Sequence, residues 1–411
     1  MSEKLWRKNY IDIEPYTAGE QPKSDDIIKL NANESPYPPS PAVSEVIARF
    51  KAEGLRLYPS MDAAPLRKAA AERLSAENGV ELTAENIFIG NGSDDVLATA
   101  FRAFFNSDKP ILFPDVTYSF YPVWCELMKI PYETPEVDER FEINAADFYR
   151  ENGGVVIPNP NAPTSIGKGK DFIIDLLEHN RDCVVIIDEA YVDFGCYSAV
   201  ELTKKYENLL VTQTFSKSRA MAGMRIGMAI GCSELIQMLG AVKDSYNSYP
   251  MDKVSIEAGV ASINDDAYFR EIVGKIMATR DRCAESLRGM GFDVAKSSTN
   301  FLFAEHKSLS AKEIFGYLRE NGIYVRYWNK PKIGNRLRIT VGTDEQMGKM
   351  LALLETERIL GDKLNKELIG LRSSLKSKLE MVAASRKHWE ATVAQKEEDL
   401  QKHVLQVPMY E

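Results

Sequence analysis

The feature that most constrains the fold is a regular alternation of short apolar runs and helical stretches between residues 86 and 231. Each apolar run has the length of a strand, and polar residues follow it directly. Such alternation is typical of an α/β fold in which helices cover both faces of a mostly parallel sheet. Because the polar residues follow the strand ends, the pattern also predicts a functional site along one edge of that sheet. The runs lie at residues 86–90, 110–113, 154–157, 183–187 and 209–211.

The remaining sequence predicts a division into four parts. Residues 1–41 are polar and rich in proline, and we interpret them as an N-terminal arm that belongs to a small domain. Residues 42–264 are expected to form the large domain, and residues 265–360 a smaller α+β domain with strands and helices in alternation. Residues 361–411 are expected to form an appended amphipathic or coiled-coil helix, because their apolar residues recur at spacings of three and four.

The composition excludes several classes of function. The chain has 411 residues and a formal net charge of -9, which gives no support for nucleic-acid binding. Its apolar runs are too short to span a membrane, and its N-terminus has no apolar core of signal-peptide length. The five cysteines are scattered without metal-like pairing. We therefore expect reduced thiols, no metal site and a cytoplasmic enzyme.

One strand end carries a lysine that is surrounded by phosphate-binding residue types. Lys217 follows Ser216 directly behind an apolar strand, and Arg225 comes eight residues later. For a lysine taken alone, a surface position is the commoner interpretation. Here, however, Ser216 and Arg225 supply groups that bind phosphate, and Asp188 ends the preceding strand. A Schiff-base lysine, an aspartate for a ring nitrogen and a phosphate-binding pair are what pyridoxal phosphate (PLP) requires.

Two further strand ends carry candidate binding residues. Residues 86–97 predict a strand, a glycine turn and the start of a helix, where Ser93 or Asp94 caps the helix beside backbone N–H groups that suit a phosphate. The turn lacks the third spaced glycine of a NAD site, so an NAD enzyme is disfavoured. Tyr118 follows another strand, either as a core residue or as a flat platform for a cofactor ring.

Three residues outside the main sheet are candidates for substrate contact. Arg326 and Arg338 lie on predicted strands of the small domain. Each is either a solvated edge residue or, if the two face a cleft, a bidentate ligand for an anionic substrate. Tyr16 lies in the polar arm, where it either packs on the body or reaches into a site shared with a second subunit.

Five segments in this order resemble the fold-type I PLP-dependent aminotransferases and, among them, the histidinol-phosphate aminotransferase family. The similarity runs from about residue 13 to about residue 358. It implies an amino-group transfer between histidinol phosphate and 2-oxoglutarate in histidine biosynthesis, with PLP as cofactor, by a homodimer with shared active sites. The segments are residues 29–34, 90–94, 188–191, 214–217 and 337–342.

The resemblance also implies a role for each matching residue. Lys217 forms the Schiff base and moves the proton, Asp188 pairs with the ring nitrogen, and Tyr118 stacks on the ring. Tyr191 and an asparagine flank the phenolic oxygen. The phosphate is bound by the neighbouring subunit's Tyr58 together with Ser93, the backbone N–H of Asp94, Ser216 and Arg225. The substrate is faced by Tyr16, Asn33, Arg326 and Arg338.

The sequence departs from the family pattern in the loop that contains the asparagine. Ala162 stands where the family has asparagine before Pro-Thr-Gly, and Ser165 replaces the glycine. We therefore assign the contact with the phenolic oxygen to Asn161.

Other functions fit the same residues. Aromatic amino-acid aminotransferases and threonine-phosphate decarboxylases share the scaffold and the PLP residues, and differ only around the substrate. A third interpretation is a scaffold that presents the helix of residues 361–411 to a partner for binding or assembly. Lys217 and Asp188 favour a working enzyme over this scaffold.

Overall fold

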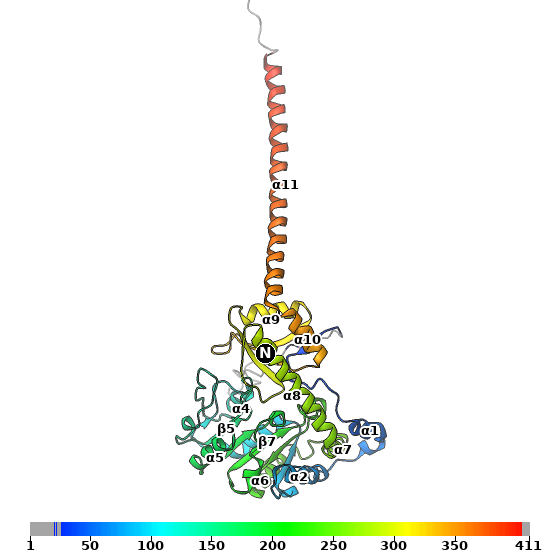
Figure 1. Cartoon of the computed structure of the whole chain (residues 1–411), viewed down its shortest axis with the longest axis vertical. Coiled ribbons are helices and arrows are strands. Elements are labelled where there is room, and N and C mark those ends of the chain that lie inside the picture. The colour runs from blue at the N-terminus through cyan, green and yellow to red at the C-terminus, as the bar shows by residue number, and fades with distance from the viewer. Residues whose placement is uncertain (1–19, 21, 23–25, 405–411) are drawn as a thin grey trace, which may run out of the picture. The chain divides into compact units, whose positions relative to one another are not determined.

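The computed structural model describes residues 20, 22 and 26–404. Tyr16 therefore lies outside the described residues. The chain divides into two units, Met1–Ala352 and Leu353–Glu411, which are described separately below (Figure 1). Within the described part of the chain, no helix combines the length and the apolar character that crossing a bilayer requires.

A seven-stranded sheet forms the centre of the first unit. Its strands are β2 (Ile87–Gly90), β3 (Ile111–Leu112), β4 (Tyr132–Glu133), β5 (Gly154–Pro158), β6 (Val185–Asp188), β7 (Leu209–Thr214) and β8 (Gly227–Ile230). They are ordered β2-β8-β7-β6-β5-β3-β4. Strand β8 is antiparallel to both of its neighbours, whereas the pairs from β7 to β4 are parallel. The predicted mostly parallel sheet is thus confirmed.

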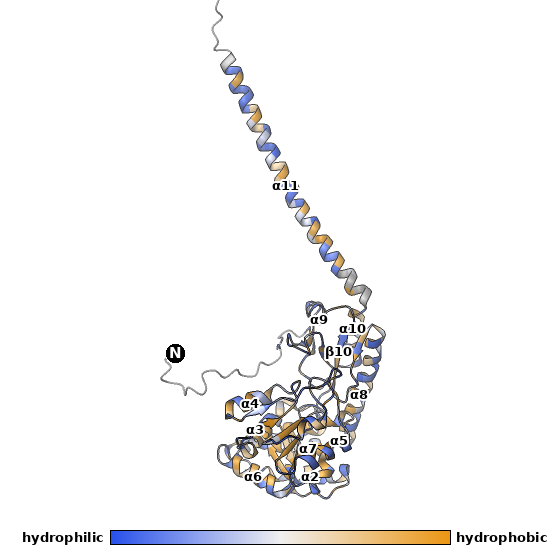
Figure 2. Cartoon of the chain, turned by 90° about the vertical axis from the view of Figure 1, so that its left-hand side faces the viewer, coloured by the Kyte–Doolittle hydropathy of each residue, from blue (hydrophilic) through white to orange (hydrophobic). Residues whose placement is uncertain are grey.

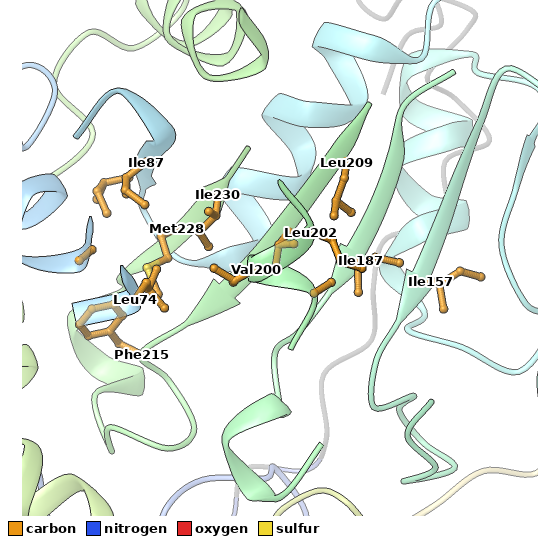
Figure 3. Packing of buried hydrophobic residues seen from close by; sticks show 14 of the residues in the cluster. Leu74, Ile87, Ile157, Ile187, Val200, Leu202, Leu209, Phe215, Met228 and Ile230 are labelled. Atoms are coloured by element: carbon orange, nitrogen blue, oxygen red, sulfur yellow. The ribbon is translucent and has the colours of Figure 1, made fainter. Parts of the chain in front are cut away.

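Both faces of this sheet are buried, which explains why its strands read as continuous apolar runs. Alternate residues of each strand point to opposite faces, so Ile157 and Ile187 enter one hydrophobic cluster, and Val156 and Ile186 enter another. Figure 3 shows side chains of the first cluster along neighbouring strands. The covering helices are α1 (Pro41–Arg49), α2 (Ala64–Asn78), α3 (Ser93–Phe104), α4 (Phe120–Met128), α5 (Lys170–His179), α6 (Ser233–Asp244) and α7 (Lys253–Asn264).

A second, five-stranded sheet completes the unit. It is formed by β1 (Ile28–Leu30), β9 (Phe292–Val294), β10 (Phe301–His306), β11 (Ile323–Tyr327) and β12 (Leu337–Thr340), in the order β1-β11-β12-β10-β9. Strand β1 pairs in parallel with β11, so residues 28–30 are built into a sheet whose other strands come from residues 292–340. Its helices are α8 (Asp266–Gly289), α9 (Ala311–Glu320) and α10 (Asp344–Leu353). This is the smaller α+β part that the sequence predicted.

The second unit is dominated by one long helix, α11 (Thr356–Val404), of 49 residues. It runs without interruption through Gly361, where the sequence suggested a boundary. A single glycine costs about 1 kcal/mol in a helix, and no proline lies nearby to break it. The predicted C-terminal long helix is therefore confirmed, although it begins before the expected residue.

Candidate active site

The polar residues that follow the strands of the large sheet line one cavity of about 190 Å³. Parallel strands bring their carboxyl ends to the same edge, so residues far apart in the sequence meet there. The wall of the cavity contains most of the residues predicted to bind the cofactor, namely Ser93, Asp94, Tyr118, Asp188, Tyr191, Ser216, Lys217 and Arg225.

Asp188 is the last residue of β6 and is buried, with 5% of its surface exposed. Its Oδ2 accepts a hydrogen bond of 2.7 Å from the hydroxyl of Tyr121, and its Oδ1 accepts one of 3.3 Å from Oγ1 of Thr212. Burial raises the pKa of Asp188 to about 6, although these hydrogen bonds favour the charged form. A cation placed beside Asp188 would therefore stabilise the charged form of this carboxyl group.

Lys217 follows β7 and lines the same cavity as Asp188. Its Nζ lies 5.7 Å from the ring centroid of Tyr191, which is 9% exposed. The amide Nδ2 of Asn33 donates a hydrogen bond of 2.9 Å to the hydroxyl of Tyr191. Asn33 is in turn bound to the small sheet, because Thr340 on β12 donates to its Oδ1 at 3.0 Å. The two sheets therefore fix the position of Tyr191 together.

The other end of the cavity has the properties of a phosphate site. Helix α3 begins at Ser93, and the first backbone N–H groups of a helix attract anions. Gly92 precedes it at φ 88°, and a Cβ there would lie 2.4 Å from Nη2 of Arg225. Only a glycine therefore lets the guanidinium approach the turn this closely. The hydroxyl of Ser216 faces the same cavity, and Nη2 of Arg225 lies 3.5 Å from a carboxylate oxygen of Asp94.

A second cavity, of about 650 Å³, shares Tyr118, Tyr191 and Lys217 with the first. Its other wall comes from the small sheet and carries Arg326 and Arg338. The guanidinium carbons of these two arginines lie 5.3 and 5.2 Å from the ring centroid of Trp328. A cation over an aromatic face is stabilised electrostatically, so the tryptophan holds both positive charges near each other at the cavity wall.

Two predicted cofactor residues lie elsewhere in the described chain. The side chain of Tyr58 is 78% exposed and stacks on Tyr249, with ring centroids 4.6 Å apart. Asn161 is buried, and its Nδ2 donates a hydrogen bond of 2.8 Å to the backbone oxygen of Val116. The cavity wall is formed by the next residue, Ala162.

Sequence reasoning missed several residues that position this site. Tyr121 and Thr212 hold Asp188, Thr340 holds Asn33, and Trp328 contacts both arginines through its ring. A signal was present for Tyr121, which follows Tyr118 by three residues and lies in the first turn of α4. The other contacts join distant parts of the chain, so only the fold reveals them. Among the described residues, no cluster of three or more His, Cys, Asp or Glu side chains is placed to hold a metal ion.

Comparison with known proteins identifies the family. The model of the aminotransferase class I and II family matches residues 25–354. The chain belongs to the class I and II aminotransferases. Enzymes of this family depend on PLP, so the protein is a PLP-dependent aminotransferase.

The similar aminotransferases include curated proteins and solved structures. The chain is 46% identical over 352 residues to the histidinol-phosphate aminotransferase of Chromohalobacter salexigens, which covers 86% of this chain and 98% of that protein. It is 48% identical over 357 residues to the histidinol-phosphate aminotransferase of Acinetobacter baumannii. This match covers 86% of this chain and 97% of that protein. The Sinorhizobium meliloti histidinol-phosphate aminotransferase, solved with pyridoxal-5'-phosphate, superposes with a TM-score of 0.72 at 23% identity, over 81% and 91% of the two chains. At that identity, the superposition supports the fold alone.

The residues of the first cavity fit PLP. A lysine amine suits the aldehyde, a buried carboxyl suits a ring nitrogen cation, and an aromatic ring at Tyr118 suits the flat face of the ring. The absence of a Cβ at Gly92 lets the guanidinium of Arg225 lie beside the start of α3, so a cation and the first N–H groups of a helix come together as a phosphate site requires.

Proposed function

We propose that this aminotransferase transfers the amino group of histidinol phosphate to 2-oxoglutarate, and runs the reverse reaction, in histidine biosynthesis. The observation that carries the proposal is the identity of 46% and 48% to histidinol-phosphate aminotransferases over 98% and 97% of their lengths. The second cavity supports it, because its two arginines suit a phosphate on the donor and carboxylates on the acceptor.

In this proposal the residues of the first cavity bind and orient the cofactor. When bound, PLP supplies an electron sink for the negative charge that develops at the substrate Cα. Asp188 keeps a negative charge beside the ring nitrogen, and Tyr118 supports the ring from one face. The hydroxyl of Ser216, the guanidinium of Arg225 and the N–H groups at Ser93 hold the phosphate.

The proton transfer belongs to Lys217. Its amine would hold the cofactor before the substrate arrives. Once the substrate amine has displaced it, the free amine of Lys217 would move the proton from the substrate Cα to the C4′ carbon of the cofactor. Tyr191, which Asn33 orients, is the predicted partner of the phenolic oxygen. Asn161, the other predicted partner, donates its Nδ2 hydrogen bond to the backbone oxygen of Val116 instead. Arg326 and Arg338 orient the substrate so that its Cα proton lies within reach of Lys217. Tyr16 is also predicted to contact the substrate.

We infer further that two copies assemble into a homodimer with shared sites. Tyr58 is 78% exposed and lies in an apolar surface region with Leu55, Leu57, Met61 and Tyr249, each at least 40% exposed. Apolar regions of this kind mark subunit interfaces. The exposed Tyr58 hydroxyl is then available to the phosphate of the neighbouring subunit. The cytoplasmic location that the sequence predicts remains a prediction.

A comparison of amino donors tests the proposed substrate. With 2-oxoglutarate as acceptor, we expect kcat/KM for histidinol phosphate to exceed that for phenylalanine by about 100-fold or more, because a site built for a polar group rejects a donor that lacks it. Glutamate formation gives the rate. A higher kcat/KM for phenylalanine would make the enzyme an aromatic aminotransferase, and release of CO2 from threonine phosphate would make it a decarboxylase.

A further inference from the structure

Helix α11 exposes a long row of large apolar side chains, which we call the apolar stripe. Their exposed fractions lie between 37% and 72%. Figure 2 shows the corresponding hydrophobic bands, which recur along the length of the helix between hydrophilic segments. The stripe lies beyond residue 354, where the match to the aminotransferase family ends, so it is independent of the proposed reaction. It consists of Leu364, Leu368, Leu371, Leu375, Leu379, Val382, Trp389, Val393 and Leu400.

The stripe stays on one side of the helix. At 3.6 residues per turn, the interval from Leu364 to Leu400 is about ten turns, and the residues between them recur at steps that keep them within about a quarter of the circumference. At 1.5 Å per residue the stripe is about 54 Å long. Two other exposed apolar residues, Ile369 and Met381, point to other sides of the helix. An apolar row of this length is costly in water and marks a surface that a partner covers.

The charges along α11 indicate which partner fits. Residues 372–387 contain five basic residues and one acidic residue, whereas residues 390–399 contain four acidic residues and one basic residue. Two parallel copies would place the basic segments against each other, and likewise the acidic segments. Two antiparallel copies place each basic segment opposite an acidic one, which is the favourable arrangement.

We propose that the part of the apolar stripe from Leu375 to Leu400 pairs with the same part of a second copy of this chain, antiparallel, with the centre of the pair in the turn Arg386–Trp389. Positions whose numbers add up to about 775 then face each other. Leu375 lies opposite Leu400 of the second copy, and Val382 opposite Val393. On the flanks, the basic residues at 376 and 378 approach the acidic residues at 399 and 397.

The same register accounts for Arg386, one of the charged residues on the side of the stripe; Lys396 and Glu397 lie there as well, between Val393 and Leu400. Arg386 lies on the side of the stripe between Val382 and Trp389. In the antiparallel pair it faces Trp389 of the second copy, and a guanidinium over an indole is a favourable contact. Within its own helix, Arg386 forms an ion pair of 2.8 Å with Glu390, which holds its side chain beside the stripe.

Disulfide cross-linking in the full-length protein tests the direction of pairing. Residues 361–411 contain no cysteine, so cysteines introduced there report on α11. We expect the double variant Leu375→Cys/Leu400→Cys to form a disulfide-linked dimer on mild oxidation, and each single variant to form none. The matched control is Met381→Cys/Ala394→Cys, whose positions also add up to 775 but point away from the stripe. Cross-linking of the single variants would show parallel pairing, and absence of cross-linking in every variant would show that α11 does not pair with itself.

Amide hydrogen exchange of α11 provides a second test that needs no cysteine. At high protein concentration we expect the amides around Leu379 to exchange at least about tenfold more slowly than in the variant Leu379→Lys/Val382→Lys, because pairing holds the helix closed. The matched variant Ile369→Lys/Met381→Lys changes equally exposed apolar residues on other sides and should keep the slow exchange. Equal exchange in both variants would overturn the proposal.

Discussion

At Asp188, burial and hydrogen bonding act on the same carboxyl group in opposite directions. Burial disfavours the charged form, whereas Tyr121, Thr212 and the N–H of Ala190 donate to it. Burial dominates and raises the pKa to about 6. The positive charge on the ring nitrogen of bound PLP would offset the cost of burying the negative charge of Asp188.

This balance predicts a pH dependence of the apoprotein. The pKa of Asp188 is about 4 in the unfolded chain and higher in the folded one, so between these two pH values the folded state binds more protons. The free energy of unfolding therefore falls as the pH rises through this range, by on the order of 3 kcal/mol in total for this group. Asp188→Asn should therefore stabilise the apoprotein more at pH 7 than at pH 5, relative to wild type. Urea unfolding measures both values. The exposed control Asp147→Asn should show no such difference, and an equal effect of Asp188→Asn at both pH values would contradict the assignment.

Trp328 is a positioning residue for the substrate in this account. Its ring lies within about 5.3 Å of the guanidinium carbons of both Arg326 and Arg338, and such contacts contribute about 0.5–2 kcal/mol each. We expect Trp328→Ala to raise KM for histidinol phosphate about tenfold and to change kcat by less than about threefold, because ground-state binding is lost. Trp328→Phe retains an aromatic face and should recover part of the affinity. A fall in kcat at unchanged KM would contradict this role.

At the scale of elements, β8 and the turn before α3 form one unit. A Cβ at Gly227 on β8 would lie 2.4 Å from backbone atoms of Gly92 and Ser93. The strand therefore approaches the turn as closely as a glycine allows, and this contact sets the position of the phosphate-binding end of α3.

The contact predicts that Gly227→Ala displaces the turn. Overpacking against backbone costs about 1–3 kcal/mol, so we expect the Kd for PLP to rise about tenfold. Fluorescence titration of the apoprotein with PLP gives the Kd. Gly240→Ala is the control, because no atom lies within 4 Å of a Cβ at that position of α6. Unchanged PLP affinity in Gly227→Ala would show that the turn tolerates the displacement.

The elements also explain which parts of the structure the sequence could predict. Strands such as β6 and β7 were predictable because burial on both faces leaves a continuous apolar run. Lys217 and Asp188 were predictable because they follow such runs. The link from Asn33 to both Tyr191 and Thr340 was not, because it depends on how two sheets pack. The start of α11 was also missed, since a glycine signals a helix boundary without enforcing one.

At the scale of the whole molecule, the account describes an enzyme that needs a second copy at each site. Tyr58 is 78% exposed and does not line the first cavity of its own chain, which agrees with the proposal that it serves the site of a second copy. The proposed pairing of α11 would add a second contact between copies, through a helix that lies beyond the residues matched by the family model.

Shared sites predict that two defective subunits complement each other. Lys217→Ala removes the amine from its own site, and Tyr58→Ala weakens phosphate binding in the neighbouring site. At limiting PLP each variant alone should be nearly inactive. After mixed refolding, half of the dimers are hybrids with one intact site of two, so we expect about a quarter of wild-type activity. Activity no higher than the sum of the separate variants would place Tyr58 in its own chain's site or outside any site.

The most direct test is an absorbance spectrum of the purified protein with PLP, recorded before and after histidinol phosphate is added. The account predicts a band near 400–430 nm, an approximate range for PLP bound to a lysine, which bleaches with this amine and which is missing in Lys217→Ala. A band that bleaches only with phenylalanine or threonine phosphate would contradict the proposed substrate. A protein that shows no band after incubation with PLP, or a Lys217→Ala variant that keeps it, would contradict the active site described above.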